Sequence, residues 1–124
     1  MKKIRKVSGS CAPLALKYLS GLCDHEVHDI CVAHGFIQEH GMEEHEFLGA
    51  AKDMGIRLRR MNLKKLGLYR SHLGRFIREN MEGKFLIYTS QHLFVVSGGQ
   101  VIDPLHPDNP GLRRIVTGVW RAVI

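Results

Sequence analysis

The chain has 124 residues, a net charge of +6 at pH 7 and a hydrophobic content of 44%. This length fits one folded domain over residues 1–124, and the composition excludes a disordered or fibrous chain. No apolar run approaches the roughly 20 residues that span a bilayer, which excludes a membrane-spanning helix. The basic start at residues 1–6 is not followed by an apolar signal core, so we expect a cytoplasmic protein with no membrane partner.

The basic residues are spread over the chain rather than gathered in one block. They include Lys2, Lys3, Arg5 and Lys6 at the N-terminus, and Arg57, Arg59, Arg60, Lys64, Lys65, Arg70, Arg75 and Arg78 in the middle. We interpret them as a solvated surface, with an acidic partner as the alternative. Because no aromatic residues alternate with them for stacking on bases, nucleic acid ranks below protein as a partner.

The predicted helical part covers residues 10–80. Residues 8–10 (SGS) predict a turn, and Pro13 suits the first turn of a helix that ends near Gly21. Cys11 then lies at or just before the N-terminus of this helix. The residues expected on its buried side are Leu14, Leu16 (or Ala15), Tyr18, Leu19 and Leu22.

Three more helices and a short strand are predicted before residue 80. One helix is capped by Asp24 and runs to about residue 35, one covers residues 43–54 and ends at Gly55, and one covers residues 66–80. Alternating residues predict a strand at 56–59. The residues expected inward are Val27, Ile30 and Cys31, then Phe47, Leu48, Ala51 and Met54, and then Leu66, Tyr69, Leu73, Phe76 and Ile77.

The C-terminal part, from residue 83 to 124, predicts an antiparallel sheet. Aromatic and β-branched residues predict strands at 85–89, 93–97 and 100–103, and two final strands at 112–117 and 119–124. A proline-rich loop at 104–111 separates the two sets. Helices followed by strands predict the α+β class, with N-terminal helices packed on a C-terminal antiparallel β-sheet.

The dipeptide at 98–99 (GG) predicts a two-residue hairpin turn that pairs Ser97 with Gln100. In this register His92 and Asp103 share one face as diagonal neighbours, about 5–8 Å apart between backbones. An imidazole N–H can reach a carboxylate across such a distance. One extra residue in the turn would move the two side chains to opposite faces.

The three cysteines, Cys11, Cys23 and Cys31, are odd in number and do not predict a disulfide framework. A cysteine with a distant histidine instead suggests thiol catalysis, which needs a thiolate, a base and a group that orients the base. The N–H groups at a helix N-terminus favour a thiolate, so we expect a lowered pKa for Cys11. His92 and Asp103 are the candidate base and orienting group.

Several segments share their order and spacing with a known family. They are residues 10–16 (SCAPLAL), 41–56 (GMEEHEFLGAAKDMGI), 83–88 (GKFLIY), 91–96 (QHLFVV) and 101–104 (VIDP). Together they resemble the nucleophile helix, the middle helix and strand, the histidine hairpin and the Asp-Pro exit of papain-like cysteine peptidases. The resemblance is closest to the peptidases that remove double-glycine leaders from bacteriocins and to their small stand-alone relatives. It implies a papain-like fold over most of the chain.

The resemblance also implies roles for particular residues. Cys11 would be the nucleophile, His92 the general base and then acid, and Asp103 the orienting group. The substrate would be a protein or peptide, cleaved at a peptide or isopeptide bond through a thioester, with no cofactor and no metal. The Cys11 N–H and one side chain would bind the oxyanion. The family has Gln six residues before the cysteine, where this chain has Arg5; the other candidate donors are Ser8, Ser10 and Gln91.

Other interpretations remain open at this point. Arg5 in place of Gln favours a catalytically silent scaffold that binds a protein partner. A zinc domain is a further alternative, because cysteine, histidine and acidic residues gather between Cys23 and His34, although they lack paired CxxC spacing. His106 is a second histidine that could act as the base, but a proline-rich loop is a poor support for one.

Overall fold

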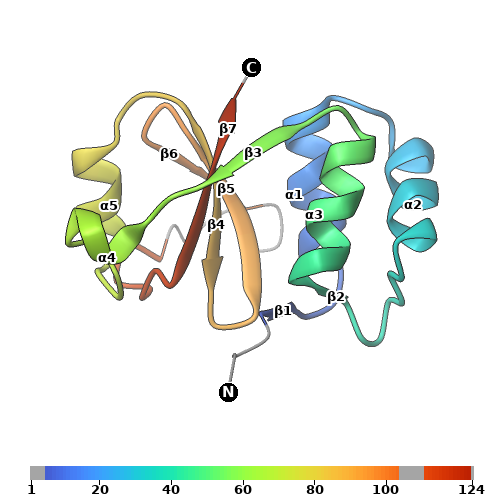
Figure 1. Cartoon of the computed structure of the whole chain (residues 1–124), viewed down its shortest axis with the longest axis horizontal. Helices are drawn as coiled ribbons and strands as arrows, with labels where there is room; N and C mark the ends of the chain where they lie inside the picture. Colours follow the sequence, from blue (N-terminus) through green and yellow to red (C-terminus); the bar gives the residue numbers. More distant parts are fainter. Residues whose placement is uncertain (1–4, 104–110, 124) are drawn as a thin grey trace.

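A computed structural model describes residues 5–103 and 111–123 (Figure 1). Within them the fold is α+β, with helices in the N-terminal part and a five-stranded antiparallel sheet built mainly by the C-terminal part. The elements are β1 (Lys6–Val7), α1 (Cys11–Ser20), α2 (Asp24–Ala33), β2 (Met42–Glu43), α3 (Glu44–Asp53), β3 (Arg57–Arg60), α4 (Leu63–Leu66), α5 (Leu73–Glu79), β4 (Lys84–Thr89), β5 (His92–Ser97), β6 (Gln100–Ile102) and β7 (Gly118–Val123). No helix in these ranges is long and apolar enough to cross a membrane.

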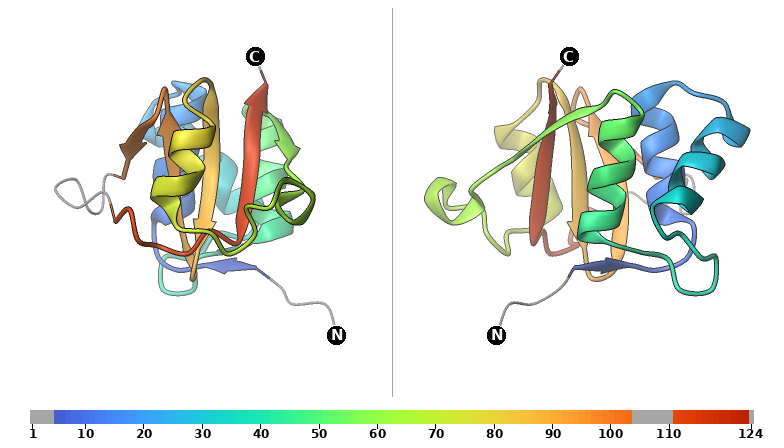
Figure 2. Two further views of the ribbon diagram at one scale, coloured as in Figure 1. Left: turned by 90° about the vertical axis from the view of Figure 1, so that its left-hand side faces the viewer. Right: turned by 45° about the vertical axis from the view of Figure 1, so that its right-hand side comes forward.

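The sheet, in the order β3-β7-β4-β5-β6, lies between two layers of helices. Figures 1 and 2 show α1, α2 and α3 on one side and α4 and α5 on the other. Alternate strand residues face the two layers, so Leu86 and Val95 belong to the core under α1, while Phe85 and Val96 belong to the core under α5. Both faces of the central strands are therefore apolar.

Helix α1 begins at Cys11 and ends where Gly21 takes the left-handed conformation at φ 72°. Its buried residues are Cys11, Ala12, Ala15 and Leu16. The small alanines allow the helix to lie close against β5. The expectation that Tyr18 is buried is wrong, since it is 42% exposed on the outer face.

The next two helices begin one residue away from the predicted positions. The N-cap of α2 is Cys23 rather than Asp24, and α3 begins with a capping box in which Glu43 N–H donates to Glu46 Oε1 at 2.8 Å. Phe47 on α3 is fully buried, and its ring meets the Trp120 ring edge to face. This contact attaches the helical layer to β7.

The single helix predicted at 66–80 is wrong, because two short helices occupy this region. Gly67, at φ 71°, ends α4, and the chain turns through Arg70 at φ 59° before α5 begins at Leu73. The strand predicted at 112–117 is also wrong. Its backbone instead bonds to the start of α5, where Leu73 N–H donates to Arg114 O at 2.8 Å. Gly74 N–H likewise donates to the Leu112 carbonyl at 2.9 Å, so both carbonyls satisfy N–H groups that have no partner within α5.

Two tight hairpins set the register of β4, β5 and β6. The turn at Gly98 and Gly99, both at positive φ, gives the predicted pairing of Ser97 with Gln100 and Val95 with Ile102. The β4–β5 turn is formed by Ser90 and Gln91, at φ 35° and 65°, so β5 begins at His92. The loop predicted at 104–111 falls, up to residue 110, outside the described residues.

The short pair β1 and β2, which was not predicted, connects the N-terminal segment to the start of α3. Val7 pairs with Met42, and both side chains are buried. Gly41, at φ 75°, lies so close to this segment that an added Cβ would strike the Val7 carbonyl. The chain therefore approaches Cys11 along a fixed path.

Gly41→Ala should lower the free energy of unfolding by about 3 kcal/mol. Positive φ costs alanine about 1–2 kcal/mol, and the clash with the Val7 carbonyl adds a similar amount. Gly55→Ala is the matched control, because Gly55 is at φ 81° with nothing within 4 Å of an added Cβ, and should cost about 1 kcal/mol. Urea unfolding measures both. Equal losses would contradict the close approach at Gly41.

Candidate functional site

Three of the residues singled out from the sequence lie in direct contact. Cys11 is the first residue of α1, His92 is the first residue of β5, and Asp103 follows β6. The Cys11 Sγ lies 2.9 Å from His92 Nδ1, and His92 Nε2 lies 2.7 Å from Asp103 Oδ2. The hairpin register thus brings the imidazole to the carboxylate while α1 brings the thiol to its other nitrogen.

These three groups differ in their access to solvent. Cys11 is 7% exposed, the His92 side chain 17% and the Asp103 side chain 2%. The His92 ring also stacks on Phe94, with 5.5 Å between centroids. Phe94 therefore covers one face of the imidazole. The His92 side chain is partly open to solvent, whereas Cys11 and the Asp103 carboxylate are buried.

Arg114 is a fourth member of this cluster that sequence reasoning missed. Its Nη1 donates to Asp103 Oδ2 at 3.0 Å, the same oxygen that His92 contacts, and its guanidinium lies over the Phe94 ring. Arg114 precedes β7 in a segment without regular structure. No motif marked it, and the sequence placed it only as one more cation within the strand predicted at 112–117.

Asp103 is held ionised by its partners. Burial alone would raise the pKa of this carboxyl, but hydrogen bonds from His92 and Arg114, together with their charges, lower the pKa below its usual value. A buried carboxylate needs such compensation, because an unpaired charge is costly in the interior. Asp103 therefore fixes the orientation of the imidazole as an anion.

The pKa of Cys11 is raised, which corrects the expectation of a lowered value. Burial is the main cause, and the negative charge of Asp103 adds to it. Hydrogen bonds from the backbone N–H groups of Leu93 and Cys11 act in the opposite direction without outweighing burial. Because the helix N-terminus is covered by the core, its effect on the thiol is smaller than the cost of desolvating a thiolate.

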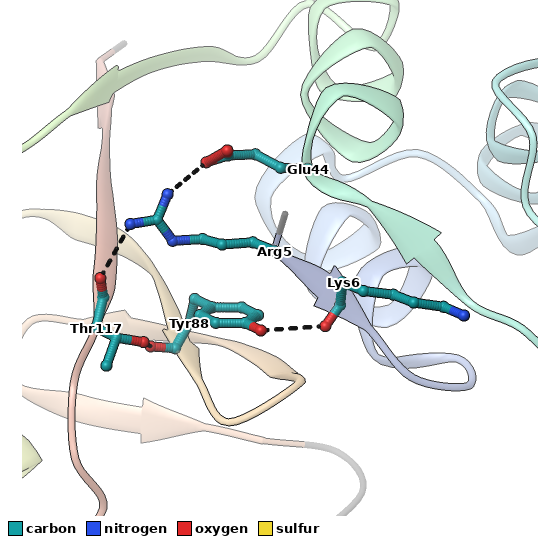
Figure 3. A network of polar contacts seen from close by, with 5 residues as sticks. All are labelled: Arg5, Lys6, Glu44, Tyr88 and Thr117. Carbon is teal, nitrogen blue, oxygen red and sulfur yellow. Dashed lines mark hydrogen bonds and ion pairs between the residues drawn. The ribbon is translucent and has the colours of Figure 1, made fainter. Parts of the chain in front are cut away.

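Arg5, the residue at the position of the family's Gln, binds elsewhere. Figure 3 shows its guanidinium donating to Glu44 Oε1 at 3.0 Å and to the Thr117 carbonyl at 3.2 Å, and it also lies over the Trp120 ring. In the same network Tyr88 Oη donates to the Lys6 carbonyl. Arg5 thus connects the N-terminal segment to α3 and β7 rather than pointing to Cys11.

Two other candidate donors, Ser8 and Gln91, bind each other. Ser8 N–H donates to the Gln91 carbonyl at 2.9 Å, and Ser8 Oγ donates to Gln91 Oε1 at 3.2 Å. Gln91 is exposed and directly precedes His92. Ser10 is the N-cap residue of α1 and makes no side-chain capping hydrogen bond.

The remaining cysteines occupy different environments. Cys31 is fully buried in the core under α1, and burial raises its pKa to about 11. Cys23 is exposed, and its Sγ donates to Glu26 Oε1 at 3.3 Å. His34 contacts Asp53 instead of another histidine or cysteine. Across residues 5–103 and 111–123, no three His, Cys, Asp or Glu side chains gather closely enough to hold a metal ion. His106 lies outside the described residues.

Comparison of the chain with protein-family models, with curated proteins and with solved structures finds no match. The chemistry of the site therefore has to be argued from its own geometry. That geometry combines a thiol, an imidazole that contacts it, and a buried carboxylate behind the imidazole. Such a set can deprotonate a thiol and return the proton to a leaving group.

Arg114→Met should destabilise the fold by about 3 kcal/mol, because it leaves the buried Asp103 carboxylate with one partner fewer. It should also raise the pKa of Asp103. A carboxyl whose pKa is lower in the folded than in the unfolded state stabilises the fold above its unfolded-state pKa, and this stability is lost as the pH falls. Acid unfolding of the variant should therefore begin at a higher pH. Fluorescence of Trp120 against urea and against pH measures both.

The double variant Arg114→Met/Asp103→Asn is the control for this interaction. It removes the charge along with its partner and should recover part of the stability lost in the single variant. If the double variant loses the sum of the two single losses, Arg114 and Asp103 are energetically independent and the assignment is wrong.

Proposed function

We propose that the chain is a papain-like cysteine hydrolase that cleaves a peptide or isopeptide bond. The observation that supports it most is the continuous contact from the Cys11 thiol through His92 to the ionised Asp103. The order of helices and sheet agrees with this proposal, as does the resemblance of the sequence segments. Its thiols are all free, which suits the reducing cytoplasm, where we place the protein.

The raised pKa of Cys11 shapes the first step of the proposed reaction. Because burial favours the protonated thiol, His92 Nδ1 takes the proton as Sγ attacks the carbonyl carbon of the scissile bond. The carbonyl π electrons move to oxygen, giving a tetrahedral oxyanion. Asp103 accepts a hydrogen bond from Nε2–H throughout and stabilises the imidazolium that forms.

The second half of the reaction reuses the same groups. His92 returns its proton to the leaving amine as the C–N bond breaks, which leaves a thioester on Cys11. Water then attacks the thioester while His92 accepts its proton. Breaking the C–S bond returns that proton to Sγ and releases the acid product. An amine in place of water would give acyl transfer through the same thioester.

Gln91 is the best candidate for the side-chain donor to the oxyanion. Its Oε1 accepts from Ser8, which holds the side chain on the segment before Cys11, and Gln91 precedes His92 in a turn with two positive φ angles. The backbone N–H of Cys11, at the start of α1, is the second donor. Gln91 would thereby take over the role that the family gives to the residue six positions before the cysteine.

A catalytically silent scaffold that binds a protein partner is the second candidate. Two observations favour it, namely the raised pKa of Cys11 and the ion pair that occupies Arg5. In that case the contact between Cys11 and His92 would be a packing contact without turnover.

Incubation with a peptide library, read by mass spectrometry, tests the proposal. Wild type should cleave a subset of peptides, and Cys11→Ser or His92→Ala should abolish cleavage while the circular dichroism spectrum stays unchanged. Asp103→Asn should reduce the rate roughly 10²-fold, since it only misplaces the base. A peptidyl acyloxymethyl ketone should label Cys11 and spare the exposed Cys23. Cleavage that survives Cys11→Ala would refute the mechanism.

Gln91→Ala should lower kcat about 10²-fold with little change in KM, because an oxyanion donor acts mainly in the transition state. Arg5→Met is the contrasting variant. It breaks the ion pair with Glu44 and should cost about 1–2 kcal/mol of stability, while kcat per folded molecule is retained. If Arg5→Met lowers kcat and Gln91→Ala does not, the donor assignment must be reversed.

A further inference from the structure

Strand β3 is one edge of the sheet and lies far from the candidate site. In the order β3-β7-β4-β5-β6, β7 and β4 separate it from β5, which carries His92. Figure 1 shows β3 crossing the front of the molecule with no helix over it. Anything that binds at this edge would leave the contact between Cys11 and His92 untouched.

The backbone of β3 presents open hydrogen-bonding groups on its outer side. Met61 N–H donates to the Val119 carbonyl at 2.9 Å, so Met61 and Val119 of β7 form a hydrogen-bonded pair. Such pairs alternate along an antiparallel ladder, so Leu58 and Arg60 direct their N–H and C=O groups away from β7. No strand among the described residues pairs with this side.

The edge carries positive charge without acidic partners. Residues 54–78 contain eight Lys and Arg and no Asp or Glu. Arg57, Arg59 and Arg60 are exposed, and none of them forms an ion pair within residues 5–103 and 111–123. Arg59 even lies directly opposite Arg121 of β7, where like charges repel. This charge pattern is unfavourable for the fold alone and suits an anionic occupant.

Two hollows flank the strand, with volumes of about 480 and 500 Å³, and Arg60 lines both. The first also has Met61, Leu63 and Tyr69 in its wall, and the second has Leu48, Leu58 and Trp120. Each therefore offers apolar surface next to cationic groups; Glu44, which also lines the second hollow, is paired with Arg5. Leu58 and Arg60 share one face of β3, so a strand added at this edge would direct every second side chain to the face that carries these residues and their hollows.

We propose that β3 is a docking strand for an extended acidic peptide segment of a partner protein. The segment adds to the open edge by backbone hydrogen bonds to Leu58 and Arg60, a known mode of peptide recognition. Carboxylates on one face of the segment meet Arg57 and Arg59, and apolar side chains on its other face enter the hollows beside Leu58 and Arg60. Single-stranded nucleic acid is the weaker candidate, because it cannot continue the β-ladder through the backbone groups of Leu58 and Arg60, and few exposed aromatic rings are available here for its bases to stack on.

Fluorescence polarisation with a labelled Glu-Val repeat of eight residues tests the proposal at low salt. Wild type should bind it, and Arg59→Glu should weaken binding at least tenfold. Arg59→Glu should also raise the Tm of the protein, because it replaces the repulsion between Arg59 and Arg121 with attraction. A loss of binding in this variant would therefore not result from unfolding. Arg78→Glu on α5 makes the same charge change away from β3 and should leave the affinity within twofold.

Backbone recognition is tested with the same peptide N-methylated at alternate residues, which should bind at least tenfold more weakly. In wild type, peptide should slow hydrogen exchange of the Leu58 and Arg60 amides. Equal binding of the N-methylated peptide would reduce the effect to charge attraction and overturn strand addition. Tighter binding of oligothymidylate would assign the edge to nucleic acid, and no binding would leave the arginines as a charged edge that prevents aggregation. Cys11→Ser lies away from this edge and should bind the peptide as wild type does. The binding result is therefore independent of whether the chain is a hydrolase.

Discussion

Helix α1 and strand β5 begin next to each other, and their packing holds the thiol of Cys11 against the imidazole of His92. Ala12 and Ala15 let the helix approach the sheet, where Leu93 and Val95 join the same buried core. A larger side chain at either alanine would push the helix outward and lengthen the 2.9 Å contact between Sγ and Nδ1. The chemistry of the site thus depends on ordinary core packing.

The imidazole is also fixed from the side of its own hairpin. Ser90 and Gln91 adopt positive φ angles that are costly for residues other than glycine, and Ser8 bonds to Gln91 through both backbone and side chain. Behind the ring, Phe94 and Asp103 set its plane and Arg114 holds the carboxylate. Because burial favours the neutral thiol at rest, the site has to be activated by proton transfer to His92 rather than by a standing thiolate.

The contact between His92 and Asp103 was predictable because a Gly-Gly turn fixes the register of a hairpin, and alternation then fixes the faces. Helix α1 was predictable because its apolar residues, Pro13 and Gly21 all mark the same boundaries. Arg114, by contrast, acts from an irregular segment, and only tertiary structure brings it to Asp103. The pKa of Cys11 was mispredicted because helix position is readable from sequence whereas burial of the helix end is not. The single helix predicted at residues 66–80 was wrong because the apolar residues of two short helices follow one another at the spacing of a single apolar stripe.

The most direct test of the account is the rate of Cys11 alkylation by iodoacetamide against pH, with exposed Cys23 as the internal reference. In wild type, Cys11 should react faster than Cys23 near neutral pH despite its burial, because His92 takes the thiol proton as Sγ attacks. In His92→Ala that advantage should disappear, and Cys11 should react more slowly than Cys23 until the solution is strongly alkaline, because burial raises the pKa of Cys11. If Cys11 follows this slow, alkaline profile in both proteins, His92 does not activate the thiol, and the contact between them is only packing.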